Sequence, residues 1–262
     1  MRIDEAFAAA DRALFIGFLV AGDPDPATGT RIADALIDGG VDLLELGVPF
    51  SDPLADGPAI QRAHARALAA GMTLDRVFDQ VRHIRSRSTV PVVLFTYANP
   101  VFRRGIERFC REAAGAGADG LLVVDLPAEE AGELDRAAGR AGLSLISLVA
   151  PTTTDRRRSM ILARARGFVY LVSREGVTGV QARMPPALAD LIAPVRSETD
   201  LPVAVGFGIS TPDQARAVAA AGADAVVVGS AIVRLIEDLP DRPEDRIRSC
   251  ADAIAAALGM PP

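Results

Sequence analysis

The chain has 262 residues, half of them hydrophobic, which is enough to bury a large core in one or two domains without disulfides or a structural metal. Its formal charge of −6 argues against a nucleic-acid binder, and no apolar run approaches the roughly 20 residues that a membrane span needs. The first residues lack the apolar segment of a secretion signal, and the two cysteines are too few for a disulfide framework or metal cluster. We therefore expect a cytoplasmic protein without a metal.

The sequence contains no lysine, and every strongly basic side chain is arginine. Schiff-base chemistry needs a lysine amine, either on a carbonyl substrate or on a tethered pyridoxal cofactor. A Walker-type phosphate loop also needs its lysine. The sequence therefore excludes these three functions for the chain acting alone.

Short apolar segments rich in Val, Ile, Leu and Phe recur along the chain, as expected for strands buried on both faces of a parallel sheet. They cover residues 14–20, 41–48, 92–98, 120–126, 143–149, 168–172, 202–209 and 225–232. Amphipathic patterns between them predict helices, among them residues 27–38, 106–116, 129–141 and 214–221. A last helix is predicted at residues 246–258, where it would cover the outside of the sheet.

Eight strands alternating with helices over about 250 residues is the size and count of a TIM barrel. A doubly wound sheet is the main alternative, but the first strand ends in Ala-Gly-Asp-Pro rather than in a glycine-rich turn. No linker or low-complexity segment divides the chain. We therefore predict one (β/α)8 TIM-barrel domain over residues 1–262, with its chemistry at the carboxyl ends of the strands.

The second predicted strand carries a glutamate, Glu45, on the same face as Val41 and Leu43. Burial of a carboxylate in a barrel raises its pKa toward the range that is useful for proton transfer. A structural glutamate paired with an arginine from a neighbouring strand is the alternative, and burial favours catalysis modestly. The following loop adds Asp52 and Asp56, and its pattern does not rank one above the other.

Glycine-rich segments follow the seventh and eighth predicted strands, at residues 205–214 and 228–232. Glycines allow backbone N–H groups to approach an anion, and these are the loops where TIM barrels most often hold phosphate. Thr211 and Gln214 also form a good capping box, a structural role compatible with phosphate binding. The long segment after the sixth strand, residues 173–180, has the glycines of a closing lid, although an ordinary surface loop is the alternative.

Other polar residues have more ambiguous patterns. Tyr97 and Tyr170 lie in predicted strands, where a substrate contact and a structural phenol are equally compatible with the sequence. Asp125 ends the fourth strand at the catalytic face. His64 and His83 fall outside the predicted barrel, so we expect both on the surface.

The segment from residue 43 to residue 61, Leu-Leu-Glu-Leu-Gly-Val-Pro-Phe-Ser-Asp-Pro-Leu-Ala-Asp-Gly-Pro-Ala-Ile-Gln, resembles the signature of the tryptophan synthase alpha subunit family almost letter for letter. Supporting segments at residues 96–102, 124–127, 151–153, 173–179 and 206–210 occur in the family's order. The resemblance covers nearly the whole chain. It implies retro-aldol cleavage of indole-3-glycerol phosphate to indole and glyceraldehyde 3-phosphate.

The resemblance also implies a role for particular residues. It gives the general acid/base role to Glu45 and gives Asp56 the task of holding the indole N–H. The substrate-binding residues that it implies are Phe18, Ile60, Tyr97 and Tyr170 around the indole, Gly179, Phe207, Gly208, Gly229 and Ser230 around the phosphate, and Thr178 in the lid. It further implies an αββα complex with a beta subunit, which would carry the pyridoxal phosphate, so no cofactor is expected in this chain.

Two alternative functions are compatible with a phosphate-binding barrel. A prenyltransferase acting on glycerol phosphate would share the glycine loops, but it would need a site for magnesium and diphosphate. A non-catalytic subunit that activates a partner enzyme is the other alternative. The buried Glu45 argues against it, because a carboxylate in a barrel is costly to keep without a function.

Overall fold

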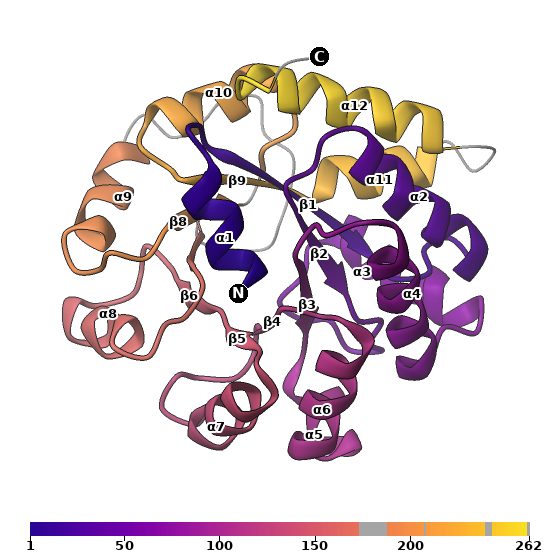
Figure 1. Cartoon of the computed structure of the whole chain (residues 1–262), viewed down its shortest axis with the longest axis horizontal. Coiled ribbons are helices and arrows are strands. Elements are labelled where there is room, and N and C mark those ends of the chain that lie inside the picture. Colours follow the sequence, from indigo (N-terminus) through magenta and orange to yellow (C-terminus); the bar gives the residue numbers. More distant parts are fainter. Residues whose placement is uncertain (173–187, 207, 239–242, 261–262) are drawn as a thin grey trace.

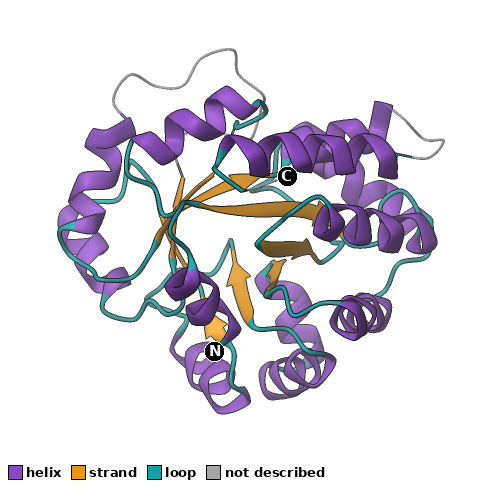
Figure 2. Cartoon of the chain, turned by 45° about the horizontal axis from the view of Figure 1, so that its top comes forward, coloured by secondary structure: helices purple, strands orange, loops and turns teal. Residues whose placement is uncertain are grey.

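The computed structural model describes residues 1–172, 188–206, 208–238 and 243–260, and it shows a parallel barrel surrounded by helices (Figure 1, Figure 2). The strands are β1 (Leu14–Val20), β2 (Leu43–Gly47), β3 (Val92–Thr96), β4 (Gly120–Val123), β5 (Ser144–Leu145), β6 (Ser147–Val149), β7 (Val169–Val172), β8 (Val203–Gly206) and β9 (Ala225–Val228). The helices are α1 (Arg2–Ala9), α2 (Pro26–Asp38), α3 (Pro58–Ala69), α4 (Leu74–Arg87), α5 (Ala98–Arg104), α6 (Ile106–Ala116), α7 (Gly132–Ala141), α8 (Asp155–Leu162), α9 (Leu188–Arg196), α10 (Pro212–Ala220), α11 (Ser230–Asp238) and α12 (Glu244–Ala257).

The strands pair in the order β5-β4-β3-β2-β1-β9-β8-β7-β6, and every pair is parallel. This arrangement confirms the predicted TIM barrel. The fifth predicted strand is divided at Ile146 into β5, which pairs with β4, and β6, which pairs with β7. The eight positions of the barrel are therefore occupied by nine strand segments in the described part of the chain, and β5 and β6 on either side of this break are the two ends of the pairing order.

Several predicted strands extended too far at their carboxyl ends. The eighth was expected over residues 225–232, but β9 ends at Val228 and α11 begins at Ser230. Ile232 is buried in the helix, so its apolar character continues the run without continuing the strand. Periodicity alone does not separate a short apolar strand from the buried start of a helix.

The predicted helices are confirmed with small changes at their ends. The segment 106–116 is α6 as predicted, and the pattern over 27–38 is α2, capped by the Asp25 side chain. The capping box of α10 is present, with the side chains of Thr211 and Gln214 each bonded to the other's backbone N–H. No helix in the part of the chain that is described combines the length and the apolar character needed to cross a bilayer.

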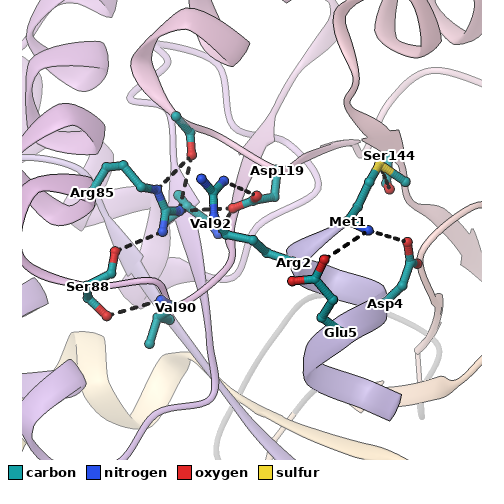
Figure 3. A network of polar contacts seen from close by, with 11 residues as sticks. Met1, Arg2, Asp4, Glu5, Arg85, Ser88, Val90, Val92, Asp119 and Ser144 are labelled. Carbon is teal, nitrogen blue, oxygen red and sulfur yellow. Dashed lines mark hydrogen bonds and ion pairs between the residues drawn. The ribbon is translucent and has the colours of Figure 1, made fainter. Parts of the chain in front are cut away.

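The amino-terminal helix α1 lies across the end of the barrel where the strands begin (Figure 1). Its Ile3 is fully buried and lies close to Gly120 at the start of β4. Asp119 ties this end together, because it accepts hydrogen bonds from Arg2 Nη1 at 2.8 Å, Arg85 Nη2 at 3.0 Å and Val92 N at 2.9 Å (Figure 3). The helix and the ion pairs close this end, which leaves the opposite, carboxyl end for a site.

Candidate active site

Glu45 lies in the middle of β2, beside Phe18 of β1 and Val93 of β3 in the sheet register. Its side chain is completely buried. No residue in the described part of the chain donates a hydrogen bond to either carboxyl oxygen, so the alternative of a glutamate paired with arginine is wrong. Burial without a partner raises the pKa of Glu45 from 4.5 to about 8. The group therefore holds a proton near neutral pH, as a general acid must.

Asp56 lies in the loop between β2 and α3 and is also buried. Its Oδ2 accepts a hydrogen bond from the Tyr97 hydroxyl at 2.7 Å and lies 3.2 Å from His64 Nε2. The Tyr97 hydroxyl in turn accepts a hydrogen bond from Ala55 N at 3.2 Å. Burial and the neighbouring Asp56 raise the pKa of Tyr97, so the phenol remains a donor to the carboxylate. These contacts hold the Asp56 carboxyl group in a defined orientation.

The two loop aspartates differ in burial and in their hydrogen-bond partners. Asp52 is exposed, and its carboxyl group accepts a hydrogen bond from the hydroxyl of the adjacent Ser51. Asp125 is exposed as well, and it accepts a hydrogen bond from Ala98 N at the start of α5 at 2.7 Å. Of these three aspartates, Asp56 is the buried one.

A small pocket at the carboxyl end of the barrel brings together most of the other predicted site residues. Tyr170, on β7, is buried, and its pKa is raised by burial and by the charges of Glu45 and Asp56, so it lies within electrostatic range of both carboxylates. The ring of Phe18 packs edge-on against Phe95 with centroids 5.2 Å apart. The residues lining the pocket are Phe18, Glu45, Ile60, Phe95, Tyr170, Gly208, Val227, Gly229 and Ser230.

Close contacts or backbone conformation favour glycine at three positions in or beside the pocket. A Cβ on Gly229 would lie 3.2 Å from the Cβ of Phe18, and one on Gly206 would lie 2.1 Å from the Tyr170 hydroxyl oxygen. Gly208 has a φ of +83°, a conformation that favours glycine. Ser230 is the first residue of α11, so the unpaired N–H groups of that helix start at the pocket. A helix N-terminus beside glycine loops suits an anion such as phosphate.

Two of the pocket residues and one partner of Asp56 were not identified from the sequence. Phe95 and Val227 are strand residues without a polar signal. His64 was expected on the surface, which is wrong, because it is only 1% exposed and contacts Asp56. A signal for it existed: His64 lies on the same face of α3 as Ile60, Ala63 and Ala67, all of which are buried.

The prediction for the other histidine is confirmed. His83 is half-exposed on α4 and contacts Asp34. The predicted site residues Thr178, Gly179 and Phe207 lie outside the described residues, and so does the proposed lid.

A (β/α)8 barrel with a buried protonated carboxyl group and an anchored carboxylate at its carboxyl end defines a barrel enzyme of the acid–base type. A family model described as tryptophan synthase alpha chain matches residues 5–257 of the chain. The chain therefore belongs to the tryptophan synthase alpha chain family.

Individual relatives agree with this assignment. The tryptophan synthase alpha chain of Methanoregula boonei is 52% identical over 250 residues, which cover 94% of each chain. The structure of Mycobacterium tuberculosis tryptophan synthase has a TM-score of 0.91 and 37% identity, over 98% of both chains. The α2β2 tryptophan synthase complex of Pyrococcus furiosus contains a chain with a TM-score of 0.88 and 39% identity, over 94% of this chain and 98% of that one.

Proposed function

We propose that the chain cleaves indole-3-glycerol phosphate to indole and glyceraldehyde 3-phosphate, as the carbon–carbon lyase of tryptophan biosynthesis. The observation that carries this proposal is the fully buried Glu45, which has no hydrogen-bond partner among the described residues and a pKa of about 8. A carboxyl group that is protonated near neutral pH is the acid that this reaction needs. Family membership supplies the substrate.

The reaction begins when Glu45 gives its proton to the ring carbon that bears the glycerol phosphate side chain. The positive charge that develops on the ring nitrogen makes the ring an electron sink. The bond between this ring carbon and the hydroxyl-bearing carbon of the side chain then breaks, and its electrons restore the indole ring. The hydroxyl proton returns to the Glu45 carboxylate, so the aldehyde leaves and the acid is regenerated. One carboxyl group performs both transfers.

Asp56 stabilises the charged intermediate by accepting the indole N–H. Support for this role comes from its burial and from Tyr97, whose hydroxyl bonds to one carboxylate oxygen. Two carboxyl groups with different surroundings thus take different roles, one as the proton donor and one as a hydrogen-bond acceptor. Phe18, Ile60, Tyr97 and Tyr170 line the indole side of the site.

We propose that the phosphate group of the substrate binds at Gly208, Gly229 and Ser230. The family resemblance also assigns substrate binding to Thr178, Gly179 and Phe207, which lie outside the described residues. Gly208, Gly229 and Ser230 line the same pocket as Glu45, which supports this role. The N-terminus of α11 adds a favourable partial charge there. Recognition of the phosphate by backbone N–H groups agrees with the absence of lysine from the sequence.

The chemistry requires no cofactor in this chain, because ring protonation provides the electron sink that an imine or metal would otherwise supply. The sequence has no lysine with which to tether pyridoxal phosphate. We assign that cofactor to a beta subunit, with which the chain forms an αββα heterotetramer. We further propose that residues 1–262 act as one domain and that the protein works in the cytoplasm.

Exposed apolar side chains near the mouth of the barrel support the beta partner. Leu54 is 83% exposed in the loop after β2, and Phe102 is 51% exposed on α5, which follows β3. Leu54 follows β2, which carries Glu45, and Phe102 follows the neighbouring strand β3. A partner that covers these two side chains would therefore contact the loop that contains Asp56. We propose that indole passes to the beta subunit across this contact.

The test is indole release from indole-3-glycerol phosphate by the purified chain, with and without a tryptophan synthase beta subunit. We expect slow release that increases strongly with beta, and Glu45→Gln, which removes the proton at nearly constant size, should abolish release in both conditions. Exposed Asp52→Asn on the adjacent loop is the matched control and should remain active. The absence of indole from the wild-type chain in both conditions would refute the proposal.

A further inference from the structure

His64 lies beside Asp56, and its ring also lies edge-on to Tyr97 with centroids 6.5 Å apart. It lies on the second turn of α3 and is only 1% exposed. Its Nδ1 lies 3.2 Å from the backbone nitrogen of Phe50, in the loop after β2, and its Nε2 lies 3.2 Å from Asp56 Oδ2. The imidazole thus bridges the end of the strand that carries Glu45 and the carboxylate of Asp56.

The contact with Phe50 determines where the proton of the ring lies. A backbone N–H can only donate, so Nδ1 must accept this hydrogen bond and carries no proton. The ring proton is therefore on Nε2, directed at Asp56 Oδ2. The same oxygen also accepts the hydroxyl of Tyr97 at 2.7 Å. Oδ2 consequently has two protein donors, whereas no described residue donates to Oδ1.

We propose that His64 is a positioning residue for the cleavage reaction: its Nε2–H, together with the Tyr97 hydroxyl, holds Oδ2 so that Oδ1 is directed at the indole N–H. The inference rests on the proposed function, because it assigns to Oδ1 the substrate contact proposed for Asp56. A carboxylate with one fixed oxygen has little freedom to rotate away when charge develops on the ring. The conformational entropy of the carboxylate is therefore lost when the protein folds, and its orientation does not have to be fixed again in the transition state.

Two amide substitutions separate the two hydrogen bonds of the ring. Glutamine places its amide nitrogen near the position of Nε2, so His64→Gln keeps a donor for Asp56. Asparagine is one carbon shorter and reaches only the position of Nδ1, so His64→Asn keeps an acceptor for Phe50 and loses the donor. Both variants retain a polar group beside the loop, and they differ in the contact that the inference needs. His83→Asn, on the half-exposed histidine of α4, is the matched control.

The experiment measures kcat and KM for indole release by the chain in complex with a beta subunit. We expect His64→Asn to lower kcat by about 10- to 100-fold, the effect of one hydrogen bond to a charged group, with a small change in KM. His64→Gln should recover most of kcat, and His83→Asn should match the wild type. Thermal unfolding of each variant separates loss of folding from loss of positioning.

An Asp56→Asn background gives the decisive comparison. If His64 acts through the Asp56 carboxylate, His64→Asn should cause little further loss of the residual activity in that background. Equal losses in both backgrounds, an unchanged kcat in His64→Asn, or no recovery in His64→Gln would overturn the inference while the proposed function stands. A wild-type complex that releases no indole would refute the function and the inference together.

Discussion

Replacing Glu45 by glutamine is expected to stabilise the protein while it removes the activity. The folded protein raises the pKa of this group from 4.5 to about 8 because the side chain is buried without a partner. A raised pKa means that the folded state binds the proton more tightly than the unfolded chain does. The contribution of Glu45 to the free energy of unfolding is therefore most favourable below pH 4.5, and it is lost as the pH rises toward 8. Glutamine does not titrate and avoids this loss.

The two pKa values set the size of the effect. Linkage between protonation and folding predicts that the wild-type protein loses stability relative to the fully protonated state. The loss is about 1 kcal/mol at pH 5 and about 3 kcal/mol at pH 7, with a limit near 5 kcal/mol above pH 8. Differences in packing and hydrogen bonding between a protonated glutamate and a glutamine are constant over this range. The stability advantage of Glu45→Gln should therefore grow by about 2 kcal/mol between pH 5 and pH 7.

Urea unfolding at pH 5, 6, 7 and 8 measures this growth directly, with the free energy extrapolated to water for each protein. Asp52→Asn is the matched control, since its side chain is exposed on the next loop, and its difference from the wild type should stay flat. A constant difference between Glu45→Gln and the wild type at all four pH values would mean that Glu45 titrates normally. That result would remove the basis for a protonated acid in the site.

Three further predictions follow from the same geometry. The value of kcat/KM should fall about tenfold per pH unit above pH 8 as Glu45 loses its proton, and a rate that stays level to pH 10 would exclude it as the acid. Gly206→Ala places a Cβ 2.1 Å from the Tyr170 hydroxyl oxygen and should lower the stability measured by thermal unfolding by about 1–3 kcal/mol. Its control, Gly139→Ala, lies in open space on α7 and should raise the stability by about 0.5–1 kcal/mol. Equal effects of the two substitutions would contradict the pocket geometry. Leu54→Asp should leave the activity of the isolated chain unchanged and abolish its stimulation by beta, measured as indole release; full stimulation would place the partner elsewhere.

The barrel was predictable because its strands are buried on both faces, which gives continuous apolar runs at regular spacing. The ends of the strands were less predictable. Ile232, for example, belongs to the apolar run that includes β9, but it lies in α11 and is buried there. The break at Ile146 had no local signal either. It reflects the closure of the ring, where β5 pairs with one neighbour and β6 with the other.

The site was predictable where strand alternation decides burial, as for Glu45. It was not predictable where loop folding decides, because Asp52 and Asp56 have similar sequence surroundings and only the fold buries the second. His64 was misassigned because a polar residue outside the strands was taken as exposed. The helical spacing of Ile60, His64 and Ala67 carries the information that places it inside.

Two buried carboxyl groups in the barrel show how the surroundings distinguish structure from catalysis. Asp119 precedes β4 at the closed end and accepts hydrogen bonds from Arg2, Arg85 and the backbone of Val92, so its charge is neutralised where it stands (Figure 3). Glu45 is buried at least as deeply and has none of these partners among the described residues. A chain rich in arginine could have paired it. The unpaired state costs folding free energy, and it leaves a proton on the carboxyl group near neutral pH, as the proposed general acid requires.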